Sequence, residues 1–176
     1  MACIPSSPAP DMAFETIGHG TINPAAKPAA NGTLVTFFPH AQCKVSRFHL
    51  KALDDMIGDF AIRGVMLLAA SADSADNLQA MAAEMQIARL PIAHSLDPTH
   101  AQERWGVLLS QGTADLDEPP VFAEPAHFWI RNDGTIGLSG IYSTPHQLPD
   151  IKNLLRAVEK CVPKGSAPRG SHIVRN

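Results

Sequence analysis

The chain has little cysteine and no long apolar run. Its three cysteines, Cys3, Cys43 and Cys161, are widely spaced among 176 residues. Such an odd, scattered set does not form a disulfide framework, and in a reducing compartment each thiol stays free. No apolar stretch approaches the roughly 18 residues that a membrane span needs. We therefore expect no membrane partner.

The chain also lacks an excess of positive charge. It has 14 Lys and Arg residues against 17 Asp and Glu residues, a formal net charge of −3. A nucleic-acid-binding domain usually has a basic surface stripe, so we expect no nucleic-acid partner. The first residues, Met1 to Pro8, have neither the basic nor the apolar part of a secretory signal. We therefore expect a cytoplasmic protein.

Histidine is the abundant metal-ligating residue here, with eight copies, but none has the close spacing of a zinc site. His40, Cys43 and His127 could converge in the fold, yet the sequence favours no metal and no cofactor. We expect most histidines to be solvated, and we expect the same of the acidic residues Asp115, Asp117 and Glu118.

The length is that of one domain. Residues 1–30 are rich in proline and predict an irregular arm, with a short edge strand over 13–17 as one option. Residues 31–162 form the predicted domain. Residues 163–176 are rich in Pro, Gly and Ser, are basic, and predict a disordered tail.

Two continuous apolar runs, 34–38 and 65–70, predict buried central strands. Between them, apolar residues recur every three or four positions and predict one helix of about five turns over 43–63. Further patterns predict helices over about 75–85, 98–105 and 149–161, a strand over 92–96, and a hairpin over 126–131 and 135–141. Residues 109–124 are predicted to be a long loop. This order predicts an α/β fold with a central mixed sheet flanked by helices.

Residues 36–47 read Thr-Phe-Phe-Pro-His-Ala-Gln-Cys-Lys-Val-Ser-Arg. They resemble the strand–loop–helix of thioredoxin-fold proteins, with Cys43-Lys44-Val45-Ser46 in place of a C-x-x-C motif. Residues 124–134 resemble that superfamily's P-A-T-F-x-I-D-x-x-G segment. With 96–107 and 148–155, the order over about 30–161 resembles the alkyl hydroperoxide reductase/thiol-specific antioxidant branch, the peroxiredoxin-like proteins. The resemblance implies a thioredoxin-like fold and a cis proline, Pro125, facing Cys43.

The chain departs from the peroxiredoxin pattern at three positions. His40 stands where the family has threonine or serine, Thr36 where it has proline, and Pro125 where it has arginine. Ser46 replaces the second thiol of a dithiol oxidoreductase. The resemblance therefore implies a protein with a single nucleophile.

The residues around Cys43 argue for the same nucleophile. A helix N-terminus favours negative charge, Lys44 and Arg47 are positive, and the hydroxyl of Ser46 can donate a hydrogen bond to the sulfur. Each effect lowers the pKa of a thiol and raises its reactivity. We expect Cys43 to be the most nucleophilic of the three thiols. The alternative is a small, inert side chain filling a corner between loop and helix.

These observations predict a thiol-dependent oxidoreductase or antioxidant protein that reduces a hydroperoxide or a disulfide through Cys43. Its reductant would be an external thiol of the thioredoxin or glutathione type, with Cys3 or Cys161 as a possible resolving thiol. Both of those cysteines are expected to be exposed. A homodimer is possible. The alternative is a degenerate thioredoxin-fold module that binds a partner and performs no chemistry.

Overall fold

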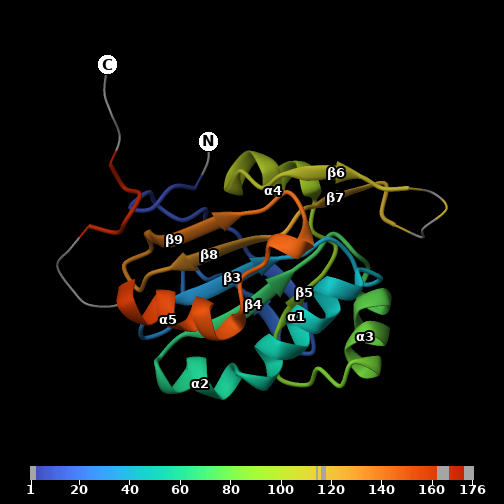
Figure 1. The fold of residues 1–176 in the computed structure, drawn as a ribbon, viewed down its shortest axis with the longest axis horizontal. Coiled ribbons are helices and arrows are strands. Elements are labelled where there is room, and N and C mark those ends of the chain that lie inside the picture. Colours follow the sequence, from blue (N-terminus) through green and yellow to red (C-terminus); the bar gives the residue numbers. More distant parts are fainter. Residues whose placement is uncertain (1–2, 114, 116–117, 162–166, 173–176) are drawn as a thin grey trace.

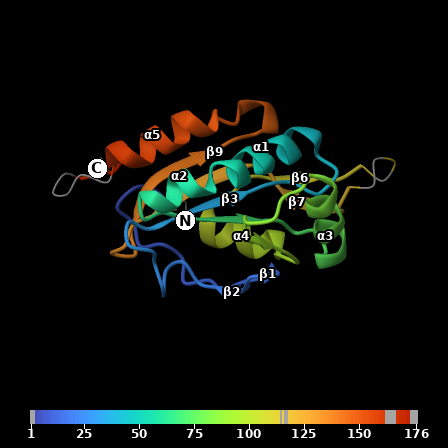
Figure 2. The same cartoon turned by 90° about the horizontal axis from the view of Figure 1, so that it is seen from below.

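The computed structural model describes residues 3–113, 115, 118–161 and 167–172. A seven-stranded sheet lies between two layers, with α1, α2, α3 and α5 on one face and α4 with the β6–β7 pair on the other (Figures 1 and 2). The strand order is β2-β1-β5-β4-β3-β8-β9. The predicted central mixed sheet flanked by helices is therefore confirmed.

The strands are β1 (Phe14–Ile17), β2 (Gly20–Ile22), β3 (Thr33–Phe37), β4 (Met66–Ala70), β5 (Ile92–Ala93), β6 (Leu109–Gln111), β7 (Val121–Ala123), β8 (Ala126–Ile130) and β9 (Ile136–Ile141). The helices are α1 (Lys44–Asp55), α2 (Ile57–Ile62), α3 (Ala75–Glu84), α4 (Pro98–Trp105) and α5 (Ile151–Cys161), with a short 3-10 helix, η2 (Pro145–Gln147).

The strand that leads to Cys43 is β3, an interior strand of the sheet, and all of its residues are buried. It pairs in parallel with β4 and antiparallel with β8. Leu34 and its neighbours on one side of the strand pack under α1, α2, α3 and α5. Val35 and Phe37 face the other way, toward Trp105 of α4. Burial on both faces explains why this strand reads as a continuous apolar run.

The predicted helix over 43–63 is two helices. It breaks at Met56, between α1 and α2. The carbonyl oxygens of Asp54 and Asp55 accept hydrogen bonds from the guanidinium of Arg89, at 2.7 and 3.4 Å. Met56 itself has φ −95° and ψ 6°, outside the regular helical values. Periodicity could not show this break, because the apolar spacing continues across Met56.

Two stretches are more regular than predicted. Within the arm of residues 1–30, β1 and β2 form a hairpin, and β1 pairs with β5. In the predicted loop 109–124, β6 and β7 form an antiparallel pair. These strands have three or four residues each, and tertiary pairing decides such short strands more than local pattern does. Most of the predicted disordered tail, namely 163–166 and 173–176, lies outside the described residues.

Candidate functional site

Cys43 is the N-cap residue of α1, directly after the turn that follows β3. Its backbone N–H donates to the carbonyl oxygen of His40 at 3.2 Å. The hydroxyl of Ser46 donates to its sulfur at 3.1 Å. Ser46 is buried while Cys43 is only half-buried. The thiol is thus held at a helix N-terminus by a fixed hydrogen-bond donor and stays within reach of small molecules.

The turn before Cys43 is fastened to the end of β4. The backbone N–H of Ala41 donates to the buried carboxylate of Asp73 at 2.9 Å. The hydroxyl of Ser71 donates to the carbonyl oxygen of Pro39 at 3.1 Å. These contacts hold the approach to the nucleophile in one conformation, as a reactive site requires.

His40 brings the β6–β7 region against this turn. Its ring packs edge-on to Phe122 at 5.1 Å, and its Nε2 lies 3.4 Å from a carboxylate oxygen of Glu118. Glu118 also accepts a hydrogen bond from the backbone N–H of Thr113 at 2.9 Å. The prediction of a solvated Glu118 is therefore wrong, and buried His40 is an exception to the expectation that most histidines are solvated. The contact depends on a hairpin that sequence periodicity did not show.

The two cations next to Cys43 are placed differently from each other. Lys44 is exposed at the first position of α1. Arg47, one turn on, forms an ion pair with Glu84 of α3. Its backbone N–H donates to the carbonyl oxygen of Cys43 at 3.0 Å. The positive charge of Arg47 is thus partly balanced by Glu84, and the sequence could not show this partner.

Pro125 is buried between β7 and β8, and the bond that precedes it is trans. The predicted cis bond is wrong. Its flanks make ordinary bonds: Glu124 N–H donates to Leu108 O at 2.8 Å, and Tyr142 N–H donates to Pro125 O at 3.0 Å. An X–Pro bond prefers trans unless its surroundings demand otherwise. Because Ala126 pairs with Phe37, Pro125 lies at the same end of the sheet as Cys43.

A polar cluster, consisting of Thr36, His127, His49 and Tyr142, lies between the sheet and α1. Thr36 and His127 are buried, whereas His49 and Tyr142 are half-buried. The Thr36 hydroxyl and His127 Nδ1 are 2.9 Å apart. The His127 ring lies 5.2 Å from that of His49 and 5.8 Å from that of Tyr142. Burial lowers the pKa of His127 to about 3 and that of His49 to about 4.

The prediction that most histidines are solvated thus fails for His127 and His49. A signal was present in the sequence. His127 lies within a strand run that is apolar on both sides, and His49 precedes Leu50 on the buried side of α1. A strand run that is apolar throughout favours burial of His127. Helical spacing next to Leu50 favours partial burial of His49.

The other two cysteines, Cys3 and Cys161, have surroundings unlike those of Cys43. Cys3 is buried, and its thiol donates to the carbonyl oxygen of Arg104 at 3.1 Å. Burial raises its pKa to about 11. The predicted exposure of Cys3 is therefore wrong, because packing against α4 covers it. Cys161 is half-buried at the end of α5, and all three thiols are free.

Within the described ranges, no group of three or more His, Cys, Asp and Glu side chains is arranged to hold a metal ion. In the same part of the chain, every helix is too short or too polar to cross a bilayer.

Comparison with known proteins finds one family and several similar structures. The model of the AhpC/TSA family matches residues 5–139. A mutant of peroxiredoxin 6 from Arenicola marina superposes with a TM-score of 0.71 at 18% identity, covering 88% of this chain and 71% of that one. AhpC from Enterococcus faecalis gives 0.71 at 16% identity, covering 91% and 92%. A yeast mitochondrial 1-Cys peroxiredoxin gives 0.70 at 16% identity, covering 88% and 74%.

No curated protein matches the chain. At these identities, the similar structures establish the fold. The family match spans most of the chain, including the β3–α1 turn with Cys43, all of β8 and the first part of β9. It confirms the class predicted from the sequence, that of thiol peroxidases and antioxidant proteins. This chain belongs to the AhpC/TSA family.

Proposed function

We propose that the protein is a peroxidase that uses Cys43 as its single nucleophile. The observation that carries this proposal is the position of Cys43 at the N-cap of α1, with the Ser46 hydroxyl donating to its sulfur at 3.1 Å. Hydrogen-bond donors and the positive end of a helix stabilise a thiolate. Buried Cys3 lacks that setting, and so does Cys161, which ends its helix.

In the proposed reaction, the Cys43 thiolate attacks one oxygen of a hydroperoxide. A sulfur–oxygen bond forms, the oxygen–oxygen bond breaks, and the leaving alkoxide or hydroxide takes a proton from solvent. The cysteine is oxidised to a sulfenic acid and the peroxide is reduced. A first external thiol then condenses with the sulfenic acid, releasing water and leaving a mixed disulfide. A second thiol releases Cys43 and leaves with the first as a disulfide.

The external reductant is inferred from the placement of the other thiols. Asp150, just before α5, is close enough to His49 to influence its titration. Cys161 lies at the other end of that 11-residue helix, roughly 15 Å further along at the usual rise. Cys3 is held against α4. One similar structure is described as a 1-Cys peroxiredoxin resolved by glutathione/thioredoxin systems, and we propose a reductant of that type here.

A second candidate is a binding module that performs no chemistry. The ion pair of Arg47 with Glu84 favours it, because Glu84 partly balances the positive charge that would activate Cys43. Under this alternative the β3–α1 turn would still bind a partner, but Cys43 would react slowly. A homodimer is compatible with either candidate.

The test is the reaction of the reduced protein with hydrogen peroxide, followed by trapping of sulfenic acid with dimedone and mass spectrometry of each cysteine. We expect trapping at Cys43 and peroxide turnover with a thioredoxin or glutathione system. Cys43→Ser should abolish both, and the matched control Cys161→Ser should retain both. If Cys43 is oxidised no faster than Cys161, the non-catalytic module is the better description.

A further inference from the structure

A cavity of about 360 Å³ opens at the end of the sheet away from Cys43. Cys43 follows the carboxyl end of β3. The cavity is lined by residues 65–67, at the amino end of the parallel neighbour β4. The length of a five-residue strand, roughly 16 Å, therefore separates the two places. The volume is in the range of small-molecule sites, which is about 300–1,000 Å³.

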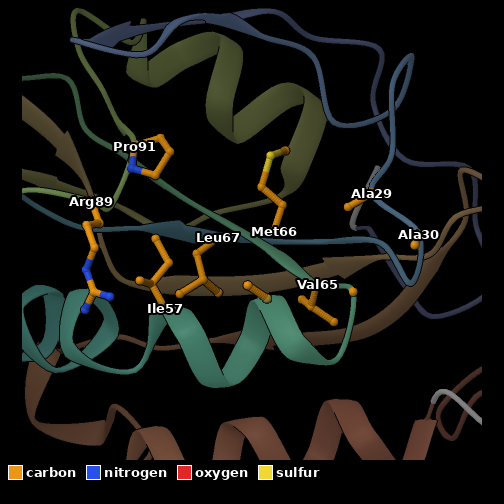
Figure 3. A pocket seen from close by; sticks show the side chains of 10 residues that line it. Ala29, Ala30, Ile57, Val65, Met66, Leu67, Arg89 and Pro91 are labelled. Atoms are coloured by element: carbon orange, nitrogen blue, oxygen red, sulfur yellow. The ribbon is translucent and has the colours of Figure 1, made fainter.

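The walls of this cavity are aliphatic. Ile57 and Ala61 are one helical turn apart on α2, and Met66 with Leu67 come from β4. Pro91 covers one side, and Ala29 with Ala30 close the end opposite to Arg89 (Figure 3). Ile57 and Met66 are only half-buried. Apolar surface is thus left in contact with water, and the flexible thioether of Met66 can adapt to a guest.

Arg89 supplies the charge at one end of the cavity (Figure 3). One of its terminal nitrogens donates to the carbonyl oxygens of Asp54 and Asp55. Its backbone N–H donates to the carboxylate of Asp54 at 2.7 Å. These bonds hold the guanidinium in place. Across the part of the chain that the structure describes, no carboxylate forms an ion pair with it.

We propose that this cavity binds an alkyl carboxylate of medium chain length. The carboxylate would pair with Arg89, whose remaining N–H groups suit an anionic oxygen. The alkyl chain would lie between α2 and β4 and cover the exposed apolar surface. An uncharged alkyl compound would not form an ion pair with Arg89, and a small anion would leave the aliphatic walls exposed to water. The site is independent of Cys43.

The experiment titrates octanoate into the full chain by calorimetry, with 1-octanol as the uncharged ligand of equal chain length. We expect octanoate to bind wild type about tenfold more tightly than octanol, a difference typical of one ion pair. Arg89→Gln should bring the two affinities together. The matched control Arg156→Gln, at an exposed position of α5, should leave octanoate binding unchanged.

A second variant tests the cavity itself. Ala61→Leu places a larger side chain in the wall at an exposed helical position, where leucine is a good helix former. It should abolish binding of both ligands, and octanoate should then no longer raise the melting temperature as it does for wild type. Absence of octanoate binding to wild type would overturn the proposal. Equal binding of octanoate to wild type and to both cavity variants would overturn it as well.

Discussion

At the scale of single residues, the candidate site depends on what each side chain near Cys43 contacts. Ser46 donates to the sulfur, whereas Arg47 is paired with Glu84. Residues at similar distances along the sequence therefore have different relations to the thiol. A buried hydroxyl that is held in place can donate a hydrogen bond to a thiolate. A positive charge that is already paired with a carboxylate stabilises the thiolate less.

Ser46→Ala should slow the alkylation of Cys43 by iodoacetamide at pH 7 by about tenfold, because hydrogen bonds to a charged group contribute roughly 1.5–3 kcal/mol. Ser46→Ala removes the hydrogen bond that stabilises negative charge on the sulfur of Cys43. The measurement is the rate of modification at each cysteine, and Cys161 in the same sample is the control. An unchanged rate at Cys43 would mean that the hydroxyl plays no part in activating the thiol.

At the scale of elements, the polar cluster of Thr36, His127, His49 and Tyr142 joins α1 to the sheet. His49 comes from α1, His127 from β8 and Thr36 from β3. The two histidine rings are neutral in the folded protein, because burial lowers the pKa of His127 to about 3 and that of His49 to about 4. In the unfolded chain both would titrate near 6.5.

The folded protein should therefore lose stability in acid. Below about pH 6.5 the two histidines bind protons in the unfolded chain but not in the folded protein, so the free energy of unfolding falls as the pH drops. The contribution of His49 ends at about pH 4, and that of His127 at about pH 3, where the folded protein binds the proton as well. The slope should approach about 1.4 kcal/mol per pH unit for each histidine. Urea unfolding at several pH values measures it.

His49→Leu should reduce that slope by about half, because only one of the two histidines that take up a proton on unfolding remains. Exposed His146 supplies the control variant, His146→Gln, which should keep the wild-type slope. If His49→Leu has the same pH dependence as wild type, the acid sensitivity comes from other groups.

At the scale of the whole molecule, the N-terminal segment is part of the fold. β1 pairs with β5, and Cys3 packs against the end of α4. Pro8 also pairs antiparallel with Thr135, just before β9, and so joins the same segment to the opposite edge of the sheet. Contacts between residues more than a hundred positions apart therefore hold a segment whose composition predicts an irregular arm.

Cys3 should accordingly report global unfolding. In the native protein, iodoacetamide should modify Cys43 and Cys161 and spare Cys3, because Cys3 is buried and its pKa is raised to about 11. In a urea series, modification of Cys3 should begin only where the circular dichroism of the sheet is lost. Labelling of Cys3 at the native rate of Cys161 would show instead that the segment opens locally.

Local pattern determined much of this protein. The apolar runs predicted β3 and β4, the Asp97-Pro98 pair predicted the start of α4, and the Asn132-Asp133-Gly134 turn predicted the β8–β9 hairpin. The position of Cys43 at a helix start was likewise readable from the residues around it. These features depend on neighbours within about one helical turn or one hairpin, which is the range over which periodicity, capping and turn chemistry act.

Tertiary structure decided the rest. Arg89 donates to the last carbonyl groups of α1, Glu84 pairs with Arg47, and α4 covers Cys3. The contact of His40 with Glu118 depends on a hairpin of two three-residue strands. Each partner lies more than thirty residues from the group it controls. A sequence pattern has a short range, whereas the free energy of burial and of ion pairing depends only on proximity in the folded chain.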